Sequence, residues 1–184
     1  MKIKEILIAK TLDLRILKPS YFSRLIWWFS FRKIIWINKK DRWNHCLEYF
    51  KILWEDGTIT HEALDADKKY KRTNYFETIK EYKIINECDT VKAFNLTQEE
   101  IQGVYWKFRS FVGTKYGVVS IFGLAWHQIT KRIKMGIDGS ESLICSESSI
   151  RGYLPYLKVP DNNKEPFDYW DPYERGKLFP MKRI

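Results

Sequence analysis

The sequence has little cysteine and little histidine, with three residues of each type in a chain of 184 residues. The number of cysteines is odd, and no two of them have CxxC spacing: they are Cys46, Cys88 and Cys145. This pattern argues against a disulfide framework and against a zinc ribbon. We therefore expect reduced thiols in a reducing compartment.

Long apolar runs are also missing. No uninterrupted apolar span approaches the roughly 18 residues that a transmembrane helix needs. The N-terminal stretch MKIKEILIAKTLDLR has charges inside its apolar run and no small-residue cleavage site, which is not the pattern of a signal peptide. We expect a cytoplasmic protein, and these features are also compatible with peripheral attachment to a membrane.

Acidic residues are fewer than basic ones, at 23 against 32, which gives a net charge of +9. Basic residues gather between Arg24 and Arg42 and again at Lys131, Arg132 and Lys134. This balance favours an anionic partner, which could be nucleic acid, a lipid surface or an acidic polymer. A length of 184 residues, 45% of them hydrophobic and 16% aromatic, predicts one globular domain over residues 1–184.

The N-terminal half predicts strands, a helix and a hairpin. Residues 3–17 predict one or two strands, and apolar positions at helical spacing predict a helix that includes residues 22–29. The runs WNHCLEYFKILW and ITHEAL flank the tetrapeptide EDGT, and an Asp-Gly pair between such runs is a strong hairpin signal. His45 is therefore expected on one strand, and His61 and Glu62 on its partner.

The C-terminal half predicts mostly helices. Residues 67–82 predict a connector or a short helix, and residues 83–96 predict a strand. Thr97 and Glu100 form a capping box for a helix that stops at Gly113, and a second helix is expected from about residue 116 to 132. A last helix begins at or just after Cys145 and stops at Pro155.

Only one cysteine has the surroundings of a nucleophile. Nucleophilic cysteine chemistry needs a thiolate, an imidazole that handles the proton, and a third group that orients the imidazole. Cys46 follows His45 on a strand, so their side chains point to opposite faces, and we expect Cys46 to be a small core residue. Cys88 stands between two acidic residues, which raise a thiol pKa and weaken the thiolate.

Cys145 lies in the stretch SLICSESSI, just before or at the start of the last predicted helix. A helix N-terminus can lower a thiol pKa from about 8.5 to between about 3.5 and 7.5. Its free N–H groups could also bind a developing oxyanion. The same local pattern is equally typical of a cysteine that fills space at a strand-to-helix corner.

His45 is the best candidate for the base, because a strand paired across a tight hairpin holds a side chain rigidly. His61 or Glu62, on the partner strand, could orient the ring, and only one of these two faces the required side. A carboxylate fixes the tautomer and stabilises the imidazolium, which favours Glu62 over His61. His127 lies in a basic amphipathic stretch and is predicted at the surface.

The order of these segments resembles a known family, the circularly permuted NlpC-type papain-like cysteine amidases of the YiiX-like group. The resemblance covers residues 3–155. The matching segments are Ser23 to Trp27, Asn44-His45, Glu62-Ala63, Gly113 with Tyr116, and Cys145-Ser146-Glu147.

This resemblance implies an α+β fold of the permuted papain-like (NlpC-type) kind, with an antiparallel sheet or open barrel packed against helices. The papain-like core would span residues 1–155, and residues 156–184, rich in proline and aromatic residues, would wrap around it irregularly. It implies attack by Cys145 on an amide, ester or thioester carbonyl, with His45 as the base and Glu62 as the orienting residue. Tyr116 and Ser146 would line the site, without a metal or a cofactor.

The implied substrate is peptide-like or an acyl group, for example a cell-wall peptide or a lipid acyl chain. The basic stretch with Trp27, Trp28 and Trp36 resembles an interfacial helix at an anionic surface, but a helix packed on the sheet of a soluble protein has the same pattern and is the favoured interpretation. The alternative is a binding or structural protein with an inactive papain-like fold. A nucleic-acid partner is disfavoured, because the sequence holds no RNA-binding sheet motif and no zinc module.

Overall fold

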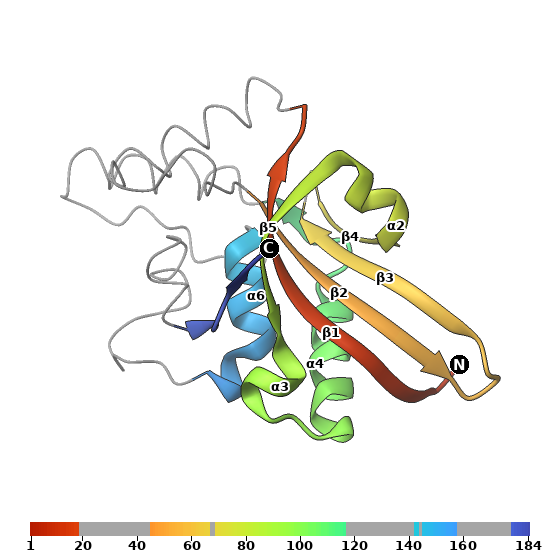
Figure 1. The fold of residues 1–184 in the computed structure, drawn as a ribbon. Helices are drawn as coiled ribbons and strands as arrows, with labels where there is room; N and C mark the ends of the chain where they lie inside the picture. Colours follow the sequence, from red (N-terminus) through yellow and green to blue (C-terminus); the bar gives the residue numbers. More distant parts are fainter. Residues whose placement is uncertain (19–44, 67–68, 117–141, 144, 158–177) are drawn as a thin grey trace.

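A computed structural model describes residues 1–18, 45–66, 69–116, 142–143, 145–157 and 178–184. Its centre is a six-stranded antiparallel sheet with the strand order β4-β3-β2-β1-β5-β8, of which Figure 1 labels β1 to β5. β6 and β7 form a separate parallel pair. The strands are β1 (Ile3–Ile16), β2 (His45–Trp54), β3 (Ile59–Ala66), β4 (Tyr70–Asn74), β5 (Tyr82–Asp89), β6 (Lys115–Tyr116), β7 (Ser142–Leu143) and β8 (Lys182–Arg183). The helices are α2 (Tyr75–Thr78), α3 (Thr90–Phe94), α4 (Gln98–Ser110) and α6 (Cys145–Tyr153), with single 3-10 turns η2 (Ile79–Glu81) and η3 (Leu154–Tyr156). The expected α+β class, with an antiparallel open sheet packed against helices, is confirmed.

The predicted hairpin joins β2 to β3. Gly57 has a φ of 83°, a conformation that glycine adopts without the steric cost of a side chain. The Trp54 N–H donates to the Thr58 carbonyl oxygen at 2.9 Å, which closes the turn. The turn fixes the register, so that Leu53 lies opposite Ile59 and Leu47 lies opposite Asp65.

The two faces of the sheet carry separate hydrophobic clusters. We call one the α6 face, because its buried residues contact α4 and α6; it carries Ala9, Cys46, Phe50, Ile52 and Leu64. We call the other the α2 face, because Tyr75 of α2 packs against it; it carries Leu12, Leu14, Leu47, Tyr49 and Ala63. The alternation of side chains along each strand produces this division.

Helices α4 and α6 lie side by side against the α6 face (Figure 1). α4 begins with the predicted capping box, in which Thr97 Oγ1 accepts from the Glu100 N–H. Gly152 of α6 faces the Phe108 ring so closely that an added Cβ would lie 2.1 Å from Phe108 Cζ. The absence of a side chain at position 152 therefore sets how near the two helices approach.

Three sequence-based expectations differ from the structure. Residues 67–82, expected as a connector or a short helix, contain the strand β4 as well as α2 and η2. The stretch 83–96, expected as one strand, changes to α3 where the Asp89 side chain accepts from the Lys92 N–H as an N-cap. The C-terminal tail, expected to be irregular, ends in β8, which pairs with β5.

The expected helix around residues 22–29 and most of the helix expected over residues 116–132 lie outside the described residues. Tyr116, at the start of the second of these, belongs to β6. In the described part of the chain, no helix combines the length and the apolar character needed to cross a membrane.

Candidate functional site

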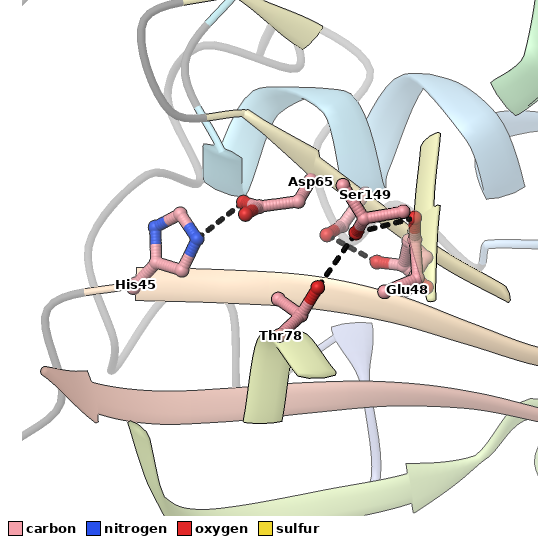
Figure 2. Close-up of polar contacts among 7 residues, drawn as sticks. His45, Glu48, Asp65, Thr78 and Ser149 are labelled. Carbon is pink, nitrogen blue, oxygen red and sulfur yellow. Dashed lines mark hydrogen bonds and ion pairs between the residues drawn. The ribbon is translucent and has the colours of Figure 1, made fainter. Parts of the chain in front are cut away.

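His45 is the first residue of β2 and lies opposite Leu14 of β1. Its side chain is buried, and its Nε2 atom lies 2.5 Å from Oδ1 of Asp65 (Figure 2). The ring also stacks on Tyr82, with 5.1 Å between the centroids and 11° between the planes. The ring is thus held by a carboxylate at its edge and by an aromatic ring on its face.

Asp65 reaches His45 because the two residues form a diagonal pair across neighbouring strands. Asp65 lies opposite Leu47, two positions from His45, and residues two apart share a face of the sheet. Burial by itself would raise the pKa of Asp65, but the charge of His45 and its hydrogen bond, together with the charge of Lys71 and the Ala66 N–H, hold that pKa below its usual value. Asp65 is therefore an ionised partner for the imidazole.

This contact defines the proton arrangement of the ring. A carboxylate only accepts hydrogen bonds, so Nε2 of His45 carries the hydrogen that points at Asp65. In the neutral ring the basic nitrogen is then Nδ1. The arrangement can take up a proton at Nδ1 and stabilise the resulting imidazolium through the Asp65 charge.

The expectation that Glu62 orients His45 is wrong. Glu62 lies opposite Phe50, five positions along β2 from His45, which at about 3.3 Å per residue is about 16 Å away. Its carboxylate accepts from the Tyr105 hydroxyl at 2.9 Å and lies 3.6 Å from Nε of Arg72. Burial and the Glu62 charge raise the pKa of Tyr105, so Glu62 has a structural partner of its own on the α6 face.

The alternative expectation, that His61 orients His45, is also wrong. It lies opposite Lys51, six positions along β2 from His45. Its Nδ1 atom is 2.8 Å from the Tyr49 hydroxyl, and its ring lies against Phe76 with 4.6 Å between the centroids. His61 therefore belongs to an aromatic cluster near the hairpin end of the sheet.

The structure describes the side chains of two of the three cysteines. Cys46 and Cys88 are both buried on the α6 face, each with 2% of its surface exposed. His45 alternates with Cys46 and lies on the α2 face with Leu14 and Leu47. The prediction that Cys46 is a core residue directed away from His45 is confirmed.

Helix α6 begins at Cys145, as the sequence predicts, and its axis leads toward the His45 end of β2. Ser149 Oγ donates to Glu48 of β2, and one turn further on the Tyr153 hydroxyl meets Thr90, which donates to the carbonyl oxygen of Ala9. Ala9 lies opposite Phe50 of β2, so Tyr153 contacts the sheet near Phe50, whereas Ser149 contacts it near Glu48. Going back along α6 from Tyr153 to Ser149 therefore leads along β2 toward His45. The turn before Ser149 continues in the direction of His45.

The other predicted site residues are described only in part. The structure places the backbone of Cys145 and Ser146 in α6 and that of Tyr116 in β6. Their side chains lie outside the described part of the structure. Within the described residues, no group of three His, Cys, Asp or Glu side chains could hold a metal ion.

The site therefore consists of a buried His45 and Asp65 pair at one end of the sheet and a helix that starts with a cysteine and approaches the same end. α6 packs on the α6 face, whereas His45 lies on the α2 face. A thiol on α6 and the imidazole could meet only around the end of β2. Comparison of the chain with protein families, with curated proteins and with solved structures finds no match in any of the three.

The Asp65 contact predicts how stability depends on pH. Because the pKa of Asp65 is lowered in the folded protein, its contribution is complete above the unfolded pKa of about 3.9 and is lost as the pH falls through the folded value. Asp65→Asn is expected to lower the free energy of unfolding at pH 7 by about 3 to 5 kcal/mol, as for other buried pairs that lose one partner.

The measurement is urea denaturation of the parent and Asp65→Asn between pH 2.5 and 7, where the difference should narrow below about pH 4. Glu87→Gln is the control, since Glu87 pairs with Lys10 at 2.7 Å in a partly exposed position, and such pairs contribute about 0 to 1 kcal/mol. Parallel curves for the parent and Asp65→Asn across the whole range would contradict the prediction.

Proposed function

We propose that the protein is a cysteine hydrolase in which Cys145 is the nucleophile, His45 the base and Asp65 the orienting carboxylate. The observation that carries this proposal is the 2.5 Å contact between Nε2 of the buried His45 and Oδ1 of Asp65. A buried imidazole with an ionised carboxylate on one nitrogen is the arrangement that a general base needs. The start of α6 at Cys145, with its axis directed to this end of the sheet, supplies the nucleophile.

In the proposed reaction the Cys145 proton passes to Nδ1 of His45, and the thiolate sulfur forms a bond to the carbonyl carbon of an amide, ester or thioester. The carbonyl electron pair moves to oxygen, where free N–H groups of the first turn of α6 would stabilise the negative charge. The bond to the leaving group breaks, and the leaving group takes the proton from His45. Water then adds to the acyl-enzyme, with His45 as base, and releases the acid and the thiol.

The proposal extends to the fold family and the substrate class. The order of His45, the following strand and the cysteine at a helix start is similar to that of the permuted NlpC-type papain-like amidases. We propose that Asp65 is the orienting residue, the role that the family resemblance implied for Glu62. The substrate would be peptide-like or an acyl group, and an anionic lipid or cell-wall surface would suit the net charge of +9.

Site-specific alkylation tests the proposal. The protein is treated with iodoacetamide between pH 5 and 9, and the modification of each cysteine is quantified by mass spectrometry. Cys145 should react with an apparent pKa below the usual 8.5 or so, and faster than the buried Cys46 and Cys88. A Cys145 pKa at or above the usual value would refute the proposal.

One observation favours a second candidate, a basic binding or structural protein with an inactive fold. His45 and α6 lie on opposite faces of the sheet, so the His45 and Asp65 pair could serve as a buried ion pair alone. In that case Cys145 should titrate as an ordinary thiol. Binding to vesicles of anionic lipid should then weaken steeply with salt, which a hydrolase does not require.

A further inference from the structure

A second carboxylate lies buried beneath α6, in the middle of β2. Glu48 has 1% of its surface exposed and lies on the α6 face. It accepts a hydrogen bond from the Ser149 hydroxyl of α6 at 2.5 Å (Figure 2). It accepts another from the Thr11 hydroxyl of β1 at 2.6 Å. The Glu48 carboxylate therefore links the central strand pair to the helix.

A carboxylate at this position is costly for stability alone. Taking an ionised group out of water costs several kcal/mol, which hydrogen bonds repay only in part. Its charge also acts on its surroundings, since burial first and Glu48 second raise the pKa values of Tyr70 and Tyr153. An apolar side chain would fill the same space at lower cost, so the contact to α6 needs a reason beyond packing.

The location of the contact supplies that reason. Ser149 stands four residues after Cys145, which is one helical turn. The first turn of a helix has N–H groups without intrahelical partners and frays most readily, and a negative charge near this end is favourable. A hydrogen bond from Ser149 to Glu48 fixes the helix one turn after the residue that must be held still.

We infer that Glu48 is a positioning residue, which holds the first turn of α6, and with it Cys145, against the sheet through Ser149. This inference rests on the proposed function, because a fixed first turn matters only if Cys145 reacts. Thr11 is the second donor that keeps the buried carboxylate satisfied when Ser149 holds one of its oxygens. The hydrogen bond from Ser149 to Glu48 would hold the N–H groups of the first turn of α6, which lower the thiol pKa, in a fixed position.

The test compares Ser149→Ala with a matched control, Tyr105→Phe. Each variant removes one hydroxyl that donates to a buried glutamate on the α6 face, from α6 to Glu48 in the first and from α4 to Glu62 in the second. Both are expected to lower the melting temperature. Only Ser149→Ala should move the Cys145 alkylation profile toward a pKa of about 8.5 and slow alkylation at pH 6.5 by about three- to tenfold.

Hydrogen exchange of the α6 amides separates this inference from the proposed function. If Cys145 of the parent titrates as an ordinary thiol, the proposed function fails, and the inference then depends on exchange alone. Ser149→Ala should speed exchange in the first half of α6 by at least about tenfold relative to Tyr105→Phe. Unchanged exchange there, or an alkylation profile in Ser149→Ala that superimposes on a low-pKa parent profile, would overturn the positioning role.

Discussion

His45→Ala is expected to lower kcat/KM for hydrolysis of an activated acyl ester or thioester by roughly 10²- to 10⁴-fold, the usual contribution of a positioned general base. The variant removes both the proton acceptor at Nδ1 and the imidazolium that would stabilise a thiolate. The same change leaves Asp65 buried without its 2.5 Å partner, so the assay belongs at a temperature where the variant is folded.

Alkylation reports the effect on Cys145 without a substrate. If His45→Ala raises the thiol pKa from about 6 to about 8.5, the thiolate fraction at pH 6 falls by about 150-fold. A thiolate of higher pKa is also a better nucleophile, by about tenfold over this range, which offsets part of the loss. The rate of alkylation at pH 6 should therefore fall by about 15-fold, whereas the rate at pH 9 should not fall.

His61→Ala is the matched control for this experiment. His61 is also an imidazole on the hairpin with a short polar contact, to the Tyr49 hydroxyl, but it lies six positions along the sheet from His45. It should change neither kcat/KM nor the alkylation profile. If His45→Ala and His61→Ala behave alike, His45 is not the base, and the buried pair with Asp65 is structural.

The contact of Asp65 with His45 depends on the strand register and not on residue types alone. The Asp-Gly turn predicts the hairpin, and the preference for a carboxylate points to Glu62, near the centre of the second strand. Since Leu53 lies opposite Ile59, counting pairs from the turn places Leu47 opposite Asp65. The register that follows from the turn therefore places Asp65 diagonal to His45 and excludes Glu62.

Capping residues explain why the start of α4 could be predicted from the sequence and why α2 and α3 could not. Thr97 with Glu100 predicted the start of α4, because both members of the capping box are recognisable. Asn74 and Asp89 cap α2 and α3 with one side chain each, and both helices are five residues or shorter, so hydrophobic periodicity cannot reveal them. β8, near the C-terminus, pairs with β5, which precedes it by almost 100 residues, and no local pattern encodes such a contact.

Phe108→Ala in α4 is expected to cause a large loss of stability, comparable to that of Asp65→Asn. The Phe108 side chain has no exposed surface, and its ring lies between Phe50 of β2 and Tyr153 of α6, with centroids at 6.0 and 5.4 Å. Removing a buried phenylalanine ring typically costs 3 to 5 kcal/mol, so we expect a loss of about that size in the free energy of unfolding. Urea denaturation at pH 7 measures it, and a loss below about 1 kcal/mol would contradict the packing described for this ring.

A double-mutant cycle with Gly152→Ala shows whether the loss arises at the contact between α4 and α6. In the parent, the new methyl group would lie 2.1 Å from Phe108 Cζ, and such overpacking costs about 1 to 3 kcal/mol. In the Phe108→Ala background that atom is gone, so Gly152→Ala should cost nothing or stabilise the helix, a coupling of about 1 to 3 kcal/mol. Gly103→Ala is the control, since no atom lies within 4 Å of its added Cβ and alanine favours a helix by about 0.5 to 1 kcal/mol over glycine. Equal costs of Gly152→Ala in both backgrounds would mean that the two helices do not meet through this pair.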